Sequence, residues 1–142
     1  MVDFAIRGDV GTATMYRRRA FAEIQEAPDA PAMLSLHAAY VRVINQRSAA
    51  IGWVVEQAAP NDRRVDELWQ EMNRNRGFGA NAAAEALMSK PGHRPDLTQP
   101  EAANIFWLAI DWSTYRSFTI HRELSDEAFE RWILDYYRRM LL

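Results

Sequence analysis

Cysteine is absent from this 142-residue sequence. The chain therefore forms no disulfide bond, offers no thiolate to a metal and has no cysteine nucleophile. A reducing compartment suits such a chain, so we expect a cytoplasmic protein. A strong charge of one sign is absent too, because 17 basic residues stand against 19 acidic ones and leave a net charge of −2. No overall field draws the chain to nucleic acid or to an anionic membrane.

Long apolar runs are also lacking. The longest weakly polar run covers residues 105–110, whereas a membrane-spanning helix requires roughly 20 apolar residues. The start of the chain has no basic stretch before an apolar one, so we expect no signal peptide. With 49% hydrophobic and 25% charged residues, the composition is typical of one soluble globular domain.

Alternation of apolar and polar residues with period two is missing at strand length. Apolar residues recur instead with a helical period, and proline and glycine fall mostly between the periodic segments. We therefore predict an all-α fold, a helical bundle of four to six helices. Residues 1–28 are expected to be a linker-like leading segment with two helical turns at 20–26, and residues 29–142 one helical domain. The helices are expected within residues 29–59, 62–88, 98–121 and 125–142, with Gly52 and residues 77–79 as candidate breaks.

The two C-terminal segments carry helix-start signals. Thr98 and Glu101 have the spacing of a capping box. Ser125 stands at an N-cap position, with Leu124 and Phe129 placed as a hydrophobic staple. These local signals predict two helices joined by a short turn.

Both predicted C-terminal helices carry more apolar surface than packing on one domain uses. A symmetric pair of subunits, each giving two helices to a four-helix interface, covers such a surface. We therefore expect a homodimer, with Trp132 and Tyr136 near the centre of its interface. The expected interface residues are Ile105, Trp112, Phe129, Trp132, Ile133 and Tyr136.

Motifs for catalysis and for metal binding are missing. The three histidines lack the spacing of di-iron or zinc sites, and no nucleophile elbow, phosphate loop or dinucleotide fingerprint occurs. His37 lies on an apolar face, which favours a hydrogen-bonded core or pocket histidine over a metal ligand. Glu67 and Glu71 share a helix face flanked by arginines, which favours solvated side chains over acid–base catalysis. We expect no enzyme activity, no catalytic residue, no metal and no cofactor.

Asp111 interrupts the most apolar segment of the chain. A carboxylate there must be paired, hydrogen-bonded or hydrated, because burying it alone is costly. One interpretation is an ion pair with Arg116, Arg76 or Arg42, or a position at an exposed edge. The other is a polar anchor in an otherwise apolar ligand cavity.

The residues after Leu97 combine several motifs. Leu97-Thr-x-x-Glu-Ala-Ala-x-Ile-x-Trp is followed by Tyr115-Arg, by Ser125-x-Glu-x-Phe-Glu-Arg-Trp-Ile-x-Asp and by a closing Arg138-Arg-x-Leu-Leu. This order resembles the C-terminal half of TetR-type transcriptional repressors. Looser agreement extends upstream to about residue 29.

The resemblance implies a helical domain that binds an effector and dimerises. Helices 98–121 and 125–142 would form the four-helix bundle of the dimer, and the helices of 31–88 would enclose the effector cavity. A small, largely apolar effector would shift the population between two spacings of the DNA-reading heads of a complete regulator. The residues expected to bind it are Tyr40, Ile44, Met72, Arg76, Trp107 and Asp111.

The sequence departs from this family before residue 29, where no helix-turn-helix pattern occurs. We expect DNA contact only through a helix-turn-helix module missing from this chain. The first hypothesis is the ligand-sensing and dimerisation domain of a TetR-like repressor, present as a fragment or as a stand-alone relative. The alternative is a stand-alone homodimeric helical protein that binds a small molecule or a protein partner without binding DNA. A helical enzyme is the third hypothesis, and no motif supports it.

Overall fold

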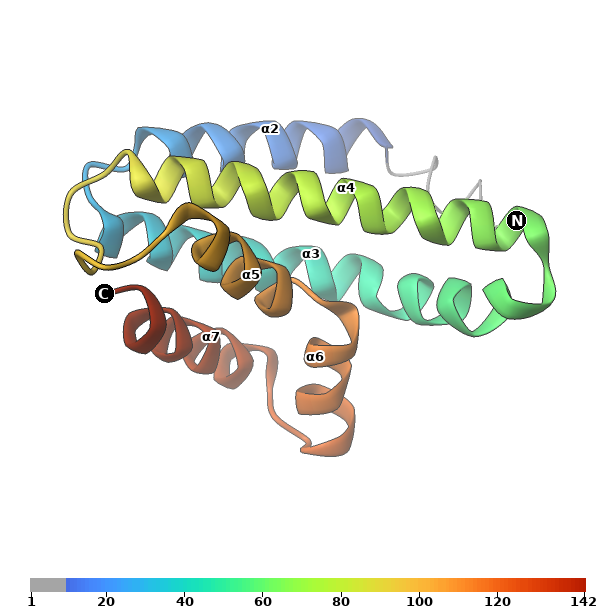
Figure 1. The fold of residues 1–142 in the computed structure, drawn as a ribbon. Coiled ribbons are helices and arrows are strands. Elements are labelled where there is room, and N and C mark those ends of the chain that lie inside the picture. Colours follow the sequence, from blue (N-terminus) through green and yellow to red (C-terminus); the bar gives the residue numbers. More distant parts are fainter. Residues whose placement is uncertain (1–9) are drawn as a thin grey trace.

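The computed structural model describes residues 10–142, with side chains described from Met15 onward. All regular structure in this part of the chain is helical, which confirms the predicted all-α class (Figure 1). Two short turns accompany the helices, a 3-10 turn η1 and a π-helical turn η2. In chain order the elements are α2 Val10–Glu26, α3 Ala30–Ala58, η1 Ala59–Asn61, α4 Arg63–Met88, α5 Gln99–Ala109, α6 Trp112–Arg116, η2 Ser117–His121 and α7 Asp126–Leu141.

The two longest helices, α3 and α4, run antiparallel as a hairpin (Figure 1). Asp29 caps α3, because its carboxylate accepts a hydrogen bond of 2.8 Å from the backbone N–H of Ala32. Asp62 caps α4 in the same way after the η1 turn. Neither Gly52 nor the stretch 77–79 breaks its helix, so both candidate breaks are wrong.

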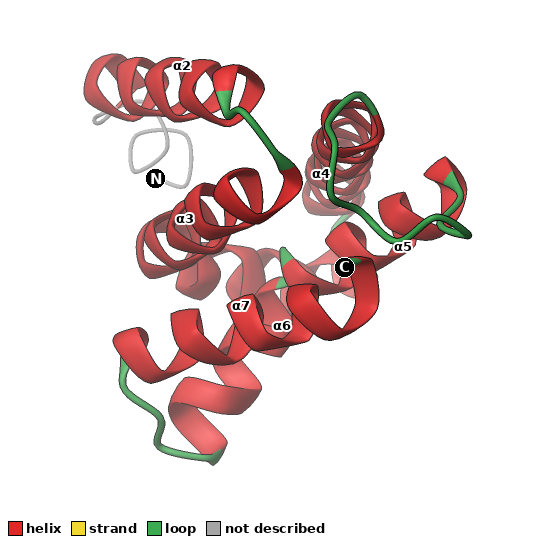
Figure 2. Ribbon diagram, turned by 90° about the vertical axis from the view of Figure 1, so that its left-hand side faces the viewer, coloured by secondary structure: helices red, strands yellow, loops and turns green. Residues whose placement is uncertain are grey.

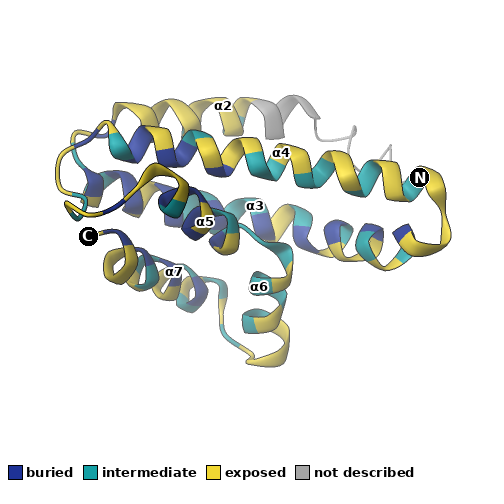
Figure 3. Cartoon of the chain, in the orientation of Figure 1, coloured by how far each residue is buried: buried dark blue, intermediate teal, exposed yellow. Residues whose placement is uncertain are grey.

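The core lies where α3, α5 and α7 meet the C-terminal part of α4, whose buried residues all lie between Ala80 and Leu87 (Figure 3). Alanines on the inner face of α4 allow α5 to approach closely, because a small side chain keeps the helix axes near each other. The largest fully buried side chains include Tyr137, Phe106, Phe129, Met33, Leu34, Leu87, Ile133 and Leu141.

The segment before residue 28 differs from the linker that we expected. Helix α2 covers Val10–Glu26 and lies against α3, on the side away from α7 (Figure 2). Ile24 is buried in the core and anchors the C-terminal end of α2. The earlier part of the expected leading segment, residues 1–9, lies outside the described residues.

The single helix expected over 98–121 is also wrong, because the chain breaks it at Asp111. Helix α5 ends at Ala109, and the backbone of Asp111 is extended, with φ −70° and ψ 131°. The Asp111 carboxylate then caps α6 by accepting from the N–H of Ser113 at 3.2 Å. Helix α6 leads away from the end of α5 in a new direction (Figure 1), and η2, which follows it, contacts α7.

Two cationic side chains of the loop between α4 and α5 bind the C-terminal ends of α2 and α7. The buried ammonium of Lys90 donates to the carbonyls of Gln25 at 2.6 Å and of Ala27 at 2.9 Å, at the end of α2. Arg94 donates through Nε to the carbonyl of Met140 at 2.8 Å, at the end of α7. Both cations therefore stand where a helix presents unpaired carbonyls and the negative end of its dipole.

None of the helices in residues 10–142 combines the length and the apolar character needed to cross a membrane.

Candidate functional site

A part-buried ion pair lies where α4 meets the α5–α6 break. Nη1 of Arg76 on α4 donates to Oδ1 of Asp111 at 2.8 Å, and the two side chains are 10% and 25% exposed. This confirms Arg76 as the ion-pair partner among the three arginines considered for Asp111. The other two face elsewhere: Arg42 pairs with Glu130 at 2.6 Å, and Arg116 lies over the ring of Trp53.

Two tryptophans enclose the Arg76 guanidinium. Its Cζ atom lies 3.5 Å from the ring centroid of Trp107 and 5.6 Å from that of Trp112, so it makes cation–π contacts with both. Trp69 packs on Trp112 with ring centroids 5.5 Å apart. Burial lowers the pKa of Arg76, while the charge of Asp111 and its hydrogen bond raise it. The Arg76 guanidinium is therefore a cation that contacts two tryptophan rings and pairs with the carboxylate of Asp111.

The Nε–H of Arg76 is buried and has no hydrogen-bond partner among the described residues. Oδ1 of Asn45 on α3 is a buried acceptor that likewise has no hydrogen-bond partner among the described residues. The orientation of the Asn45 amide follows from its other end, because Nδ2 donates to the carbonyl of Val41 at 3.1 Å. An unsatisfied buried polar atom costs about 1–3 kcal/mol, so two of them near one helix pair suggest a function beyond packing.

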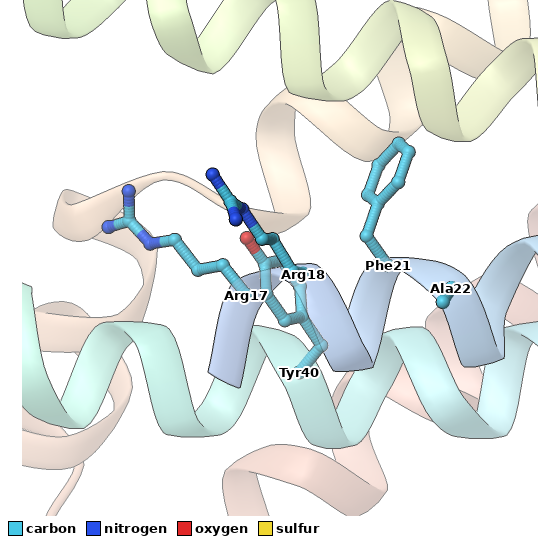
Figure 4. A pocket seen from close by; sticks show the side chains of 5 residues that line it. All are labelled: Arg17, Arg18, Phe21, Ala22 and Tyr40. Atoms are coloured by element: carbon cyan, nitrogen blue, oxygen red, sulfur yellow. The ribbon is translucent and has the colours of Figure 1, made fainter. Parts of the chain in front are cut away.

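The other expected ligand residues do not gather at Arg76 in one cavity. Tyr40 lines two shallow pockets along α2 and α3, with volumes of about 410 and 290 Å³. The larger pocket is also lined by Arg17, Arg18, Phe21 and Ala22 of α2, and the Tyr40 hydroxyl points toward the two arginines (Figure 4). Ile44 and Met72 are half-buried and line neither pocket. The structure therefore brings together Arg76, Trp107 and Asp111 and places Tyr40 in a separate pocket.

His37 is a core residue, as its place on an apolar face predicted. Its Nδ1 shares a hydrogen bond of 2.8 Å with the hydroxyl of Tyr137, and the ring of Phe106 lies 4.7 Å away. Burial lowers the pKa of His37 to about 3, so the imidazole is neutral at pH 7. His37 therefore serves as the hydrogen-bond partner of the Tyr137 hydroxyl inside the core.

Helix α7 has two apolar faces. The inner face carries Phe129 and Ile133, which are fully buried within the subunit. The outer face carries an aromatic row: Trp132 packs on Phe118 of η2 at 4.4 Å and stacks on Tyr136 at 5.6 Å. Trp132 is 41% exposed, although it is one of the largest apolar side chains in the chain.

Three of the six residues expected at the dimer interface are buried within the subunit. Ile105, Phe129 and Ile133 belong to the core of one subunit and do not reach its surface. Trp112 is half-buried and packs against Gly52, where an added Cβ would lie 2.7 Å from the ring. Of the expected interface residues on α7, Trp132 is exposed, and Tyr136 stacks on it while packing partly against the core.

Comparison of the chain with protein-family models, with curated proteins and with solved structures gives no match.

Sequence patterns missed three polar residues that matter to these arrangements. Asn45 follows Val41 by one helical turn on an apolar face, and a polar residue in such a stripe is a signal that we did not use. Lys90 and Arg94 lie in a loop, where sequence spacing does not indicate the helix ends that they cap. Their partners are 65 and 46 residues away along the chain.

Proposed function

We propose that this chain is the ligand-sensing and dimerisation domain of a TetR-like transcriptional repressor. The motifs after Leu97 support the family, and the outward aromatic row of α7 is the observation that carries the dimerisation. A complete regulator of this kind would use ligand binding in this domain to control DNA binding by a separate helix-turn-helix module.

The argument for dimerisation rests on the spacing along α7. Trp132, Tyr136 and Met140 recur every four residues and form one stripe, whose first and last members are 41% and 39% exposed. Leu108 of α5 and Ile120 of η2 add exposed apolar surface at neighbouring elements. A second copy of the chain, related by a two-fold axis, would cover this stripe with the same residues of its own.

The argument for sensing rests on the connection between the Arg76 site and the aromatic row. Asp111 binds Arg76 and also caps α6, and α6 continues into η2. η2 carries Phe118, which packs on Trp132. A ligand that changes the position of Asp111 would therefore move α6 and η2 and alter the surface presented to the partner subunit.

Light scattering on purified protein tests the dimerisation. We expect the unaltered chain to be a dimer at micromolar concentration and Trp132→Glu to be a folded monomer, because the new carboxylate would be buried without a partner. Trp53→Glu on α3 is the matched control, since Trp53 is 43% exposed and its aromatic ring contacts Arg116 of α6 instead of the α7 stripe. A monomeric unaltered chain, or equal loss of dimer in both variants, would contradict the proposal.

A further inference from the structure

A pocket of about 410 Å³ lies along helices α2 and α3. Four residues of α2 and one residue of α3 line it, namely Arg17, Arg18, Phe21, Ala22 and Tyr40. Its volume falls within the range of about 300–1,000 Å³ that is usual for small-molecule sites. The pocket is shallow, so a molecule bound in it would keep one side in contact with water.

The pocket has a polar end and an apolar end. Figure 4 shows the guanidinium groups of Arg17 and Arg18 and the hydroxyl of Tyr40 toward one end, and the ring of Phe21 toward the other. Because Phe21 follows Arg17 by four residues, the two ends are about 6 Å apart along the helix axis. A molecule that uses both ends must therefore carry a polar group and an apolar body.

The two arginines at the polar end have no acidic neighbour on their own helix. Side chains three and four positions apart meet on a helix, and for Arg17 and Arg18 these positions hold alanine, threonine, methionine and phenylalanine. Arg19, by contrast, pairs with Glu23 at 3.3 Å. None of the five described lining residues is acidic. The polar end therefore offers positive charge and N–H donors to an anion.

Tyr40 adds a hydroxyl donor to this end of the pocket. Burial raises the pKa of Tyr40 from its ordinary value of 10.0, and the nearby charge of Arg17 lowers it by less. The hydroxyl therefore keeps its proton at neutral pH and can donate it in a hydrogen bond to an anion.

The apolar end is formed by a side chain that the fold leaves uncovered. Phe21 is 41% exposed, whereas Ile24, on the next turn of α2, is buried in the core and attaches the helix to the domain. An apolar body that lies on the Phe21 ring would remove this surface from water, which favours binding.

We propose that this pocket binds a small anionic amphiphile, a carboxylate joined to an apolar body of about the size of a phenylalkyl group. Arg17 and Arg18 pair with the carboxylate, whose two oxygens match the parallel N–H groups of a guanidinium. The Tyr40 hydroxyl donates to the same carboxylate, and Phe21 and Ala22 contact the apolar body. As an effector site the pocket rests on the sensing role proposed above. As a binding site it stands without that role, because none of its described lining residues belongs to the Arg76–Asp111 pair or to the α7 stripe.

4-Phenylbutyrate is a suitable probe, because three methylene groups separate its carboxylate from its ring. NMR of the 15N-labelled intact chain follows the backbone amides, and we expect saturable shifts at residues 17–22 and at Tyr40. 4-Phenylbutan-1-ol keeps the apolar body without the charge, and butyrate keeps the charge without the ring. Each should bind about tenfold or more weakly. Equal binding of either compound, or shifts spread evenly over the chain, would overturn the proposal.

The double variant Arg17→Gln, Arg18→Gln removes the charge of the polar end and should weaken 4-phenylbutyrate binding about tenfold or more. The matched control is Arg63→Gln, Arg64→Gln, which changes two exposed adjacent arginines at the start of α4 and alters the net charge equally. This control should leave the affinity unchanged. Equal losses in the two double variants would show attraction by net charge alone and would overturn the pocket.

Phe21→Ala removes the apolar wall and should weaken 4-phenylbutyrate binding about fivefold, because less apolar surface is buried. Phe78→Ala on α4 is the matched control, since Phe78 is 70% exposed and does not line the pocket. Equal losses in these two variants would overturn the role of Phe21. If Phe21→Ala does not fold, the series of three compounds on the unaltered chain still decides the site.

Light scattering separates this inference from the proposed function. A dimer whose α2 resonances do not shift with 4-phenylbutyrate keeps the proposed dimerisation and overturns the pocket. A monomer that binds 4-phenylbutyrate at α2 supports the pocket and contradicts the dimerising function.

Discussion

The imidazole of His37 on α3 and the hydroxyl of Tyr137 on α7 share a hydrogen bond of 2.8 Å, although they are 100 residues apart in sequence. The pair joins the first long helix to the last helix inside the core. Because burial lowers the pKa of His37 from 6.5 to about 3, the folded state keeps this ring neutral where the unfolded chain protonates it.

The first prediction concerns pH. Below pH 6.5 the unfolded state binds a proton that the folded state does not, so the contribution of His37 to stability is fully present above that pH and is lost as the pH falls toward 3. The free energy of unfolding should fall by about 1.4 kcal/mol per pH unit in this window. Urea titrations between about pH 6 and 4.5 measure this slope before most carboxylates titrate.

His37→Gln should flatten that slope, because the titrating group is gone. His121→Gln is the control, since His121 is an exposed residue of η2, and it should leave the slope unchanged. An unchanged slope in His37→Gln would show that another group carries the pH dependence.

The second prediction concerns the Arg76–Asp111 pair. Asp111→Ser keeps an N-cap for α6 but leaves the mostly buried Arg76 cation without its partner, which should cost about 3 kcal/mol of unfolding free energy. Adding Arg76→Met should recover most of this loss, because an apolar side chain then fills the space between the tryptophans. A double-mutant cycle by urea denaturation gives the coupling energy, and additive losses would contradict the interaction.

Local features of this fold were predictable from the sequence, because each depends on a few neighbouring residues. Thr98 and Ser125 cap α5 and α7 as predicted, with side-chain oxygens that accept from the N–H groups of Glu101 and Ala128. The all-α class followed from periodicity in the same local way.

Features that depend on distant partners were not predictable. The break at Asp111 is held in part by Arg76, 35 residues away, and the helical period across the break gave no sign of it. Trp112 was predicted at a dimer interface because the predicted helix 98–121 is apolar nearly all round, yet its ring packs on Gly52 within the subunit. Composition shows that an apolar side chain will be covered, but only the tertiary arrangement decides which surface covers it.

The third prediction concerns the α4–α5 loop. Lys90→Met keeps much of the buried volume but removes both hydrogen bonds to the carbonyls of Gln25 and Ala27. Losing bonds from a charged donor should cost roughly 2 kcal/mol and leave the C-terminal end of α2 less firmly attached to α3. Hydrogen exchange should therefore increase most in α2 and little in α7. Uniform acceleration across all helices would show that Lys90 supports the whole core instead.

The fourth prediction compares two glycines in different surroundings. At Gly52 of α3 an added Cβ would lie 2.7 Å from the Trp112 ring, so Gly52→Ala must displace Trp112 or separate α3 from α6. This overpacking should cost roughly 1–3 kcal/mol. At Gly79 of α4 nothing lies within 4 Å of an added Cβ, so Gly79→Ala should stabilise the helix by about 0.5–1 kcal/mol. Thermal unfolding of the two variants should move in opposite directions, and a stabilised Gly52→Ala would disprove the close packing of Trp112 on α3.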